Sequence, residues 1–332
     1  MTELSPEAVR NWAKHAHGSP LYAHLIGVIA DSDQLMEVLN RIENWPRPNV
    51  LFAAVQYLLM RGRSPELARF YPSLHGDPAP VDDVDDPFRD FVIGNEEQIV
   101  EIGRTRFTQT NECRRCALLL PAIWRTALTR FHLIDVGSSA GLNLALDRYR
   151  YRWDDIVWGP PESPVQLVTE LRGRPPEPGA IEVLGRTGLD LNPIDLTDPE
   201  ERMWLDALIW PEHEERRQRL RAAVSAASSV DFRTVRGSAL DTLGPTLDDL
   251  PDGEPALVMN SFTLNQFTGE ERDQFAETLK SASGKRPVAQ VSLEHMHRDD
   301  LWAKLAIDEG GGLVVIGQAH PHGEWLDLYA RP

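Results

Sequence analysis

The chain has 332 residues, of which 42% are hydrophobic and 26% are charged, and its formal net charge is −17. This length and composition are typical of one large globular domain, or of a domain with an appended region. The acidic excess disfavours binding to nucleic-acid phosphates. No apolar stretch reaches the roughly 18 residues of a membrane helix, and the N-terminus lacks the basic and apolar segments of a signal peptide. We therefore expect a cytoplasmic protein that binds neither nucleic acid nor membranes.

Residues 1–105 show the spacing of apolar residues that is typical of helices. Ser5-Pro6-Glu7 and Ser64-Pro65-Glu66 each place a capping serine before a proline, which is a common helix start. We predict an N-terminal helical cap region over residues 1–105.

Strand-like and helix-like segments alternate over residues 106–332, which favours a parallel sheet with helices on both faces. The predicted fold is α/β, with a doubly wound, mostly parallel seven-stranded sheet. The last two strands are joined by a short linker, which predicts an antiparallel hairpin. Residues 150–178 alternate apolar and polar side chains, which predicts an inserted hairpin or an extension of the sheet edge. The seven strands are expected near residues 131–136, 181–186, 231–236, 256–261, 287–293, 312–319 and 325–330.

The first strand of this region carries Asp135 and leads into a turn of small residues, Gly137–Gly141, before a predicted amphipathic helix. Glycine permits a tight turn and lets a ligand approach backbone N–H groups, because a Cβ would block both. The alternative is that the turn needs small residues only for packing.

A second motif, Gly188-Leu189-Asp190-Leu191-Asn192-Pro193, follows the second predicted strand. An ionised carboxylate has two acceptor oxygens and suits a vicinal diol. Asp190 could equally form a local turn or helix cap before Pro193.

The two motifs, in this order, resemble those of class I S-adenosylmethionine (SAM)-dependent methyltransferases. The chain also resembles a bacterial family of unknown function with the signatures QTNE, GxSAGLNLxxDxYxY and GxDxxPxD, which stand here at Gln109–Glu112, Gly137–Tyr151 and Gly188–Asp195. The resemblance implies a methyltransferase-type, Rossmann-like sheet and SAM as cofactor, with Asp190 on the ribose hydroxyls and Ser238 in place of the usual acid near adenine. The expected cofactor-binding residues are Arg106, Gln109, Asn111, Asp135, Gly137, Ser139, Ala140, Gly141, Asn143, Asp190, Leu191, Ser238, Ala239 and Asn260.

The QTNE run has two interpretations. Arg106, Gln109 and Asn111 could line the cofactor or substrate cleft, where an arginine suits a carboxylate. Alternatively, Thr110 or Asn111 caps the following helix and Glu112 lies in its first turn.

Polar residues after the fourth and fifth predicted strands are candidates for chemistry, because ligands bind beyond the carboxyl ends of strands in open α/β sheets. We expect Asn260, Asn265 and Glu294 to be catalytic, with His295 and His297 as further possible bases. Placement at the surface is the alternative for Glu294 and the two histidines. Capping by Ser261 or Thr263 is the alternative near Asn260.

Metal binding is not expected. Cys113 and Cys116 have the spacing of a redox pair or half a zinc site, but no second pair exists and two buried thiols are the better interpretation. His320 and His322 lie in the predicted terminal hairpin, where exposed loop histidines explain them as well as a ligand role does.

We predict a SAM-dependent methyltransferase that acts on a small molecule. The alternative is a non-catalytic protein that binds SAM or a nucleotide and keeps the methyltransferase fold, since fold does not fix function. NAD- or ATP-dependent chemistry is disfavoured, because the chain has neither G-x-G-x-x-G nor a P-loop.

Overall fold

A computed structural model describes residues 3–12, 14, 18–297 and 300–330. The chain divides into two compact units. Unit 1 comprises Met1–Thr110 and Thr197–Gln218, and unit 2 comprises Asn111–Leu196 and Arg219–Pro332. Within the described residues, no helix is both long enough and apolar enough to cross a membrane.

Unit 1 is helical, and its predicted helix starts are confirmed. The Ser5 hydroxyl accepts a hydrogen bond from Ala8 N (3.2 Å), and the Ser64 hydroxyl accepts one from Leu67 N (3.2 Å). Both bonds satisfy N–H groups that have no partner inside the first helical turn. The helices are α1 (Pro6–Trp12), α2 (Pro20–Ala30), α3 (Asp33–Arg41), α4 (Arg47–Met60), α5 (Pro65–Ala68), η2 (Val81–Asp83), α6 (Asp85–Gly94), α7 (Glu96–Thr105) and α9 (Pro199–Ala207), while α10 (Glu214–Ala227) contains the boundary between the units.

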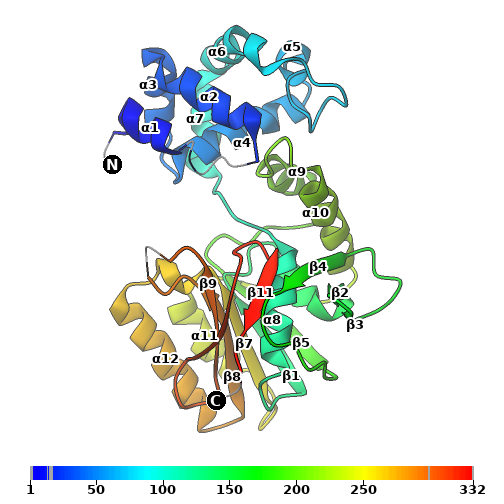
Figure 1. The fold of residues 1–332 in the computed structure, drawn as a ribbon. Helices are drawn as coiled ribbons and strands as arrows, with labels where there is room; N and C mark the ends of the chain where they lie inside the picture. Colours follow the sequence, from blue (N-terminus) through cyan, green and yellow to red (C-terminus); the bar gives the residue numbers. More distant parts are fainter. Residues whose placement is uncertain (1–2, 13, 15–17, 298–299, 331–332) are drawn as a thin grey trace. The chain divides into compact units, whose positions relative to one another are not determined.

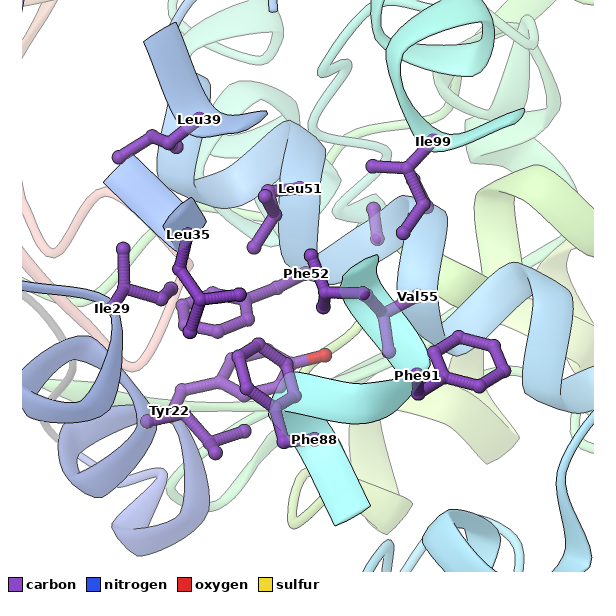
Figure 2. Close-up of a cluster of buried hydrophobic side chains, with 14 of the residues drawn as sticks. Tyr22, Ile29, Leu35, Leu39, Leu51, Phe52, Val55, Phe88, Phe91 and Ile99 are labelled. Carbon is purple, nitrogen blue, oxygen red and sulfur yellow. The ribbon is translucent and has the colours of Figure 1, made fainter. Parts of the chain in front are cut away.

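Helix α4 forms the centre of unit 1, because nearly all of its side chains are buried. Figure 2 shows Phe52 and Val55 of α4 among apolar side chains from α2, α3, α6 and α7. The ring of Tyr22 stacks on Phe52 with centroids 4.2 Å apart. The amide of Gln56, also fully buried, donates to the carbonyls of Ala207 (2.8 Å) and Ile209 (2.7 Å). Burial of apolar surface therefore holds α4 among its neighbours, and one side-chain amide joins it to the segment after α9.

Unit 2 contains an eleven-stranded mixed sheet, so the predicted mostly parallel, seven-stranded Rossmann-like sheet is wrong, although the α/β class holds. All seven predicted strands are present, as β1, β5, β6, β7, β8, β10 and β11. The strand order is β3-β2-β4-β11-β10-β9-β8-β7-β1-β5-β6. The strands are β1 (Arg130–Val136), β2 (Arg150–Trp153), β3 (Ile156–Trp158), β4 (Gln166–Leu171), β5 (Glu182–Asp190), β6 (Arg233–Arg236), β7 (Ala256–Ser261), β8 (Val288–Glu294), β9 (Ala303–Asp308), β10 (Val314–Ala319) and β11 (Trp325–Leu328).

Short connections explain why the second part of the sheet is antiparallel. Strands β6, β5, β1, β7 and β8 are parallel to one another, but β9, β10 and β11 each run opposite to the strand before them in the chain. A parallel crossover needs a dozen or more residues. The segments 295–302, 309–313 and 320–324 are too short for one, so these strands must turn back on themselves. The predicted terminal hairpin is therefore confirmed as β10–β11, whereas β9 was not anticipated.

The segment 150–178 forms the antiparallel hairpin β2–β3 and the further strand β4, which pairs with β11 and extends the sheet at that side. Trp325 at the start of β11 pairs with Glu170 near the end of β4, so residues 166–169 continue beyond the start of β11. The predicted amphipathic helix after the glycine turn is instead the 3-10 helix η4 (Leu142–Arg148), with non-helical angles at Ala145. The chain re-enters a strand at Arg150, directly after this segment.

Helices cover the parallel strands. Helices α11 (Ala239–Asp248) and α12 (Gly269–Ser283) pack together and bury an apolar cluster with β1, β5 and β7 (Figure 1). Helix α8 (Cys116–Ile123) is wholly buried and contacts β8 and β9. Its first residue and Cys113 are buried free thiols, as predicted.

We expect Gln56→Leu to destabilise unit 1 by about 1–3 kcal/mol, because it removes the Gln56 donor from the Ala207 and Ile209 carbonyls, of which Ile209 keeps Arg217, and the acceptor from the Ser73 hydroxyl. The matched control is Gln34→Leu on the exposed face of α3, which should change stability by no more than about 0.5 kcal/mol. Thermal and urea unfolding of both variants measure the difference. Equal stability of the two variants would contradict a structural role for the Gln56 bonds.

Candidate functional site

The carboxyl ends of four parallel strands meet at one edge of the sheet in unit 2. Strand β1 lies between β5 and β7, and β8 lies beyond β7. After β1 the chain forms β2, β3 and β4 at the far edge of the sheet, returns as β5 and β6 on one side of β1, and then forms β7 and β8 on the other side. Ligands of open α/β sheets bind outside the carboxyl ends of the strands. The candidate residues that follow these strands therefore gather at one edge.

The glycine turn after β1 has the backbone that its sequence demands. Gly137 (φ 76°) and Gly141 (φ 71°) occupy the left-handed region, which glycine enters at little cost. Ser139 also has a positive φ of 50°, which is strained for a residue with a Cβ. The N–H groups of Gly137 and Ser138 donate to the carbonyl of Leu189 on β5 (2.8 and 3.2 Å). The turn is thus anchored to the neighbouring strand.

Asp190 connects the two motifs by a hydrogen bond. Its Oδ2 accepts a hydrogen bond from Ser139 N (2.7 Å), and its Oδ1 accepts one from Asn192 N (2.7 Å). The second bond is the local turn considered from the sequence, while the first joins the end of β5 to the glycine turn. Leu191, beside Asp190, is 65% exposed. Each carboxylate oxygen keeps a further lone pair, so Asp190 can still accept a hydrogen bond from a ligand.

Asn111 is held against the same turn. Its Nδ2 donates to the Ser139 hydroxyl (3.0 Å), and its Oδ1 accepts from Ala140 N (3.3 Å). The capping interpretation of Thr110 or Asn111 is wrong, because Glu112 caps the 3-10 helix η3 (Cys113–Arg115) by accepting from Arg114 N. The buried Glu112 carboxylate also forms an ion pair with Arg219 (3.0 Å).

The other candidates of the QTNE region belong to unit 1. Arg106 forms an ion pair with Glu201 (2.6 Å) there, and its guanidinium lies 5.9 Å from the ring centroid of Trp204. Gln109 precedes the boundary between the units, which falls after Thr110. The cofactor-binding roles of Arg106 and Gln109 stay predictions.

Asp135 lies behind the glycine turn and is almost completely buried. It is hydrogen bonded to Asn143, whose Oδ1 accepts from the Cys116 thiol (3.3 Å). The Oδ2 atom of Asp135 has no hydrogen-bond partner among the described residues. Burial, with a smaller contribution from the charge of Asp190, raises the pKa of Asp135 to about 8, against the lowering effects of the Asn143 bond and Arg115. Near pH 7 this carboxyl group is therefore mostly protonated.

The turn after β6 contributes through its backbone. Gly237 N donates to the carbonyl of Asp190 (2.9 Å), and the Ser238 hydroxyl caps α11 by accepting from Leu240 N (3.3 Å). Ala239 is the first, buried residue of α11. Ser238 thus has a capping role, and its contact with adenine stays a prediction.

Hydrogen bonds connect Glu294 to the side chain of Asn260 and to the backbone of Asn265. The buried Asn260 amide donates to Glu294 Oε1 (2.8 Å) and to the Ser292 hydroxyl (2.8 Å), and its Oδ1 accepts from Gln290 (2.8 Å). Glu294 also accepts from the backbone N–H of Asn265 (3.1 Å), whose side chain is exposed. Burial raises the pKa of Glu294, and its hydrogen bonds oppose that shift. Their catalytic roles stay predictions.

The sequence did not single out Phe262 or Arg115. Phe262 follows β7 with a positive φ of 56°, and the Arg115 guanidinium lies 4.2 Å from its ring centroid. His295 meets the same ring edge-on at 5.2 Å. The one available signal was an aromatic residue directly after a strand end, because the contact with Arg115 joins residues far apart in the chain.

The histidines of the β10–β11 turn contact each other. His320 Nδ1 accepts a hydrogen bond from His322 N (3.2 Å), and burial lowers the pKa of His320. His320 Nε2 lies 3.8 Å from Glu324. Over the part of the chain that the structure describes, no group of three His, Cys, Asp or Glu side chains is arranged to hold a metal ion.

Comparison with protein families gives one match. A family model described as "Uncharacterized protein conserved in bacteria (DUF2332)" matches residues 6–328. The match spans both units and every candidate residue named above. Comparison with curated proteins found no match.

We expect Gly137→Ala to be more destabilising than Gly253→Ala, although both glycines have similar positive φ angles (76° and 72°). A Cβ at Gly137 would overlap the Thr263 side chain, whereas nothing lies within 4 Å of one at Gly253. The left-handed backbone alone costs about 1–2 kcal/mol, and the overlap should add about 1–3 kcal/mol. Equal unfolding free energies of the two variants would show that the contact relaxes freely.

The buried Asp135 should make stability depend on pH. Because folding raises its pKa from about 4 to about 8, the folded state binds the proton more tightly. The contribution of Asp135 to the free energy of unfolding is therefore fully present below about pH 4. It is lost, by up to about 1.4 kcal/mol per pH unit, as pH rises to about 8. Asp135→Asn removes this titration, so the melting temperature of the wild type should fall relative to the variant between pH 5 and pH 8. A constant difference over that range would contradict the protonated state.

Proposed function

The chain belongs to the bacterial family DUF2332, and we propose that it is a SAM-dependent methyltransferase that acts on a small molecule. The observation that carries the proposal is the hydrogen bond between Ser139 N and Asp190 Oδ2 (2.7 Å). It brings the small-residue turn of the first motif and the acid of the second motif together, at the carboxyl ends of two adjacent parallel strands. Two motifs that resemble methyltransferase sequences thus form one site.

The residues present fit the chemistry of SAM. Packing accounts for two glycines of the turn, because a Cβ at Gly137 would meet Thr263 and one at Gly141 would meet Phe232, so the support for SAM comes from the residues beside the turn. Asp190 is a carboxylate with remaining acceptor capacity, which suits the two hydroxyls of a ribose. The exposed apolar side chain of Leu191, next to Asp190, suits the flat face of an adenine.

The contribution of the protein to methyl transfer is mainly positional. SAM supplies a methyl group on a positively charged sulfur that is reactive toward a nucleophile. The chain must hold the acceptor in line with that methyl group and remove a proton where the acceptor carries one. His295 lies at the end of β8, beside Phe262, and a neutral imidazole is suited to accept such a proton.

A small acceptor is favoured over a nucleic acid. The formal net charge of −17 opposes the approach of a polyanion. A non-catalytic SAM-binding protein remains the competing hypothesis. The two are separated by incubating the protein with methyl-labelled SAM and a bacterial metabolite extract, because only an enzyme transfers the label.

We expect the wild type to bind SAM or S-adenosylhomocysteine with micromolar affinity in calorimetry. Asp190→Ala should weaken that binding by about 1.5–3 kcal/mol, the range for a hydrogen bond to a charged group. Asp308→Ala is the matched control, because Asp308 also accepts two backbone N–H bonds, from Gly310 and Gly312, at the other end of the sheet. No binding of either ligand at millimolar concentration would refute the proposal, and equal affinities of the two variants would remove Asp190 from the site.

A further inference from the structure

Glu294 is the most heavily hydrogen-bonded side chain at the candidate site. Its Oε1 accepts from Thr263 N (2.8 Å), Leu264 N (3.0 Å) and the Asn260 amide (2.8 Å), and its Oε2 accepts from Asn265 N (3.1 Å). The carboxylate is 7% exposed. Three successive backbone N–H groups after β7 therefore converge on one buried acid that projects from β8.

These bonds surround a strained residue. Phe262 precedes the three N–H groups and has a positive φ of 56°, which costs a bulky residue of order 1–3 kcal/mol. Its own N–H donates to Leu293 O (3.0 Å), next to Glu294. Such a conformation persists only where the surroundings over-determine it, and here bonds to β8 lie on both sides of the strained residue.

The turn held by Glu294 also contacts the glycine turn. The Thr263 hydroxyl donates to Val136 O at the end of β1 (3.0 Å), and the Thr263 side chain fills the space where a Cβ of Gly137 would lie. A displacement of Thr263 must therefore alter the support of Gly137. One carboxylate on β8 is connected in this way to both β7 and β1.

We propose that Glu294 is a positioning residue that fixes the Phe262 ring on the acceptor side of the site and, through Thr263, the glycine turn on the cofactor side. The names acceptor side and cofactor side rest on the proposed function. The mechanical coupling through Thr263 does not depend on it. A general-base role for Glu294 is disfavoured, because its oxygens are engaged by four donors and shielded from solvent. Its removal should act on Gly137 without any direct contact between the two residues.

The test uses Glu294→Gln in the full-length protein. The amide keeps the size of the side chain and one acceptor oxygen, but its NH2 group faces a backbone N–H donor where the second carboxylate oxygen accepted. We expect faster hydrogen exchange in the segments 262–266 and 137–141, and at least tenfold weaker binding of S-adenosylhomocysteine. The matched control is Glu254→Gln, which removes a half-buried acid bonded to His132 (2.5 Å) just before the amino end of β7 and should change neither readout.

A double-mutant cycle shows whether Thr263 carries the effect. Thr263→Val keeps the side-chain shape but removes the bond to Val136, so it should also speed exchange at 137–141. If Glu294 acts through Thr263, the double variant should lose no more affinity than the weaker-binding single variant, whereas independent roles would add. Thr263→Val also provides the exchange readout should Glu294→Gln fold poorly.

The outcomes separate the two proposals. Wild-type exchange at 137–141 in Glu294→Gln, or equal effects of the Glu254 control, would overturn the positioning role. Absence of S-adenosylhomocysteine binding by the wild type would instead refute the cofactor, and the exchange measurement would still decide the coupling. Additive affinity losses in the cycle would overturn the path through Thr263.

Discussion

The contact between Gly137 and Thr263 constrains the candidate site more than any other. The Thr263 side chain occupies the space where a Cβ of Gly137 would lie, so the turn after β1 packs directly against the residue pair that follows β7. Hydrogen bonds from the same turn to Leu189 connect it to β5 on the other side. Packing and backbone hydrogen bonds thus fix the ends of β1, β5 and β7 to one another. These fixed strand ends determine where the polar side chains at this edge lie.

Among the described residues, buried polar side chains at this edge of the sheet are hydrogen bonded, with one oxygen atom of Asp135 as an exception. Asn260 and Glu294 have their oxygen and nitrogen atoms engaged by side chains or backbone N–H groups, as burial requires. The Oδ2 atom of Asp135 does not, and protonation of the carboxyl group is the physical response to that environment. An acid kept neutral between the carboxylate of Asp190 and the thiol of Cys116 avoids placing a second negative charge behind the glycine turn.

Local patterns in the sequence predicted the strands and helix starts well, because a serine before a proline or an apolar run acts over a few residues. Sheet composition depended on connection lengths, and β9 was missed because Ala303–Asp308 contains few β-branched and no aromatic residues, although Gly310–Gly312 marks its end. The sequence assigned the glycine turn and Asp190 to one cofactor site; the structure joins them by a hydrogen bond, and the cofactor role stays a prediction. The sequence did not predict Glu112 as the cap of η3. The contact of Arg115 with Phe262 joins distant segments, and such contacts cannot be predicted from a single sequence.

Strain at the site argues for a purpose other than stability. Ser139 and Phe262 both occupy the left-handed region without being glycine, and they follow β1 and β7, two adjacent parallel strands. The remaining such residue in the described chain, Asp154, lies in the tight turn between β2 and β3, where such angles are ordinary. A glycine at either site position would relieve the strain. Ser139 provides a hydroxyl that is bonded to Asn111, and Phe262 provides a ring that contacts Arg115. The strained backbone therefore holds these two side chains in place.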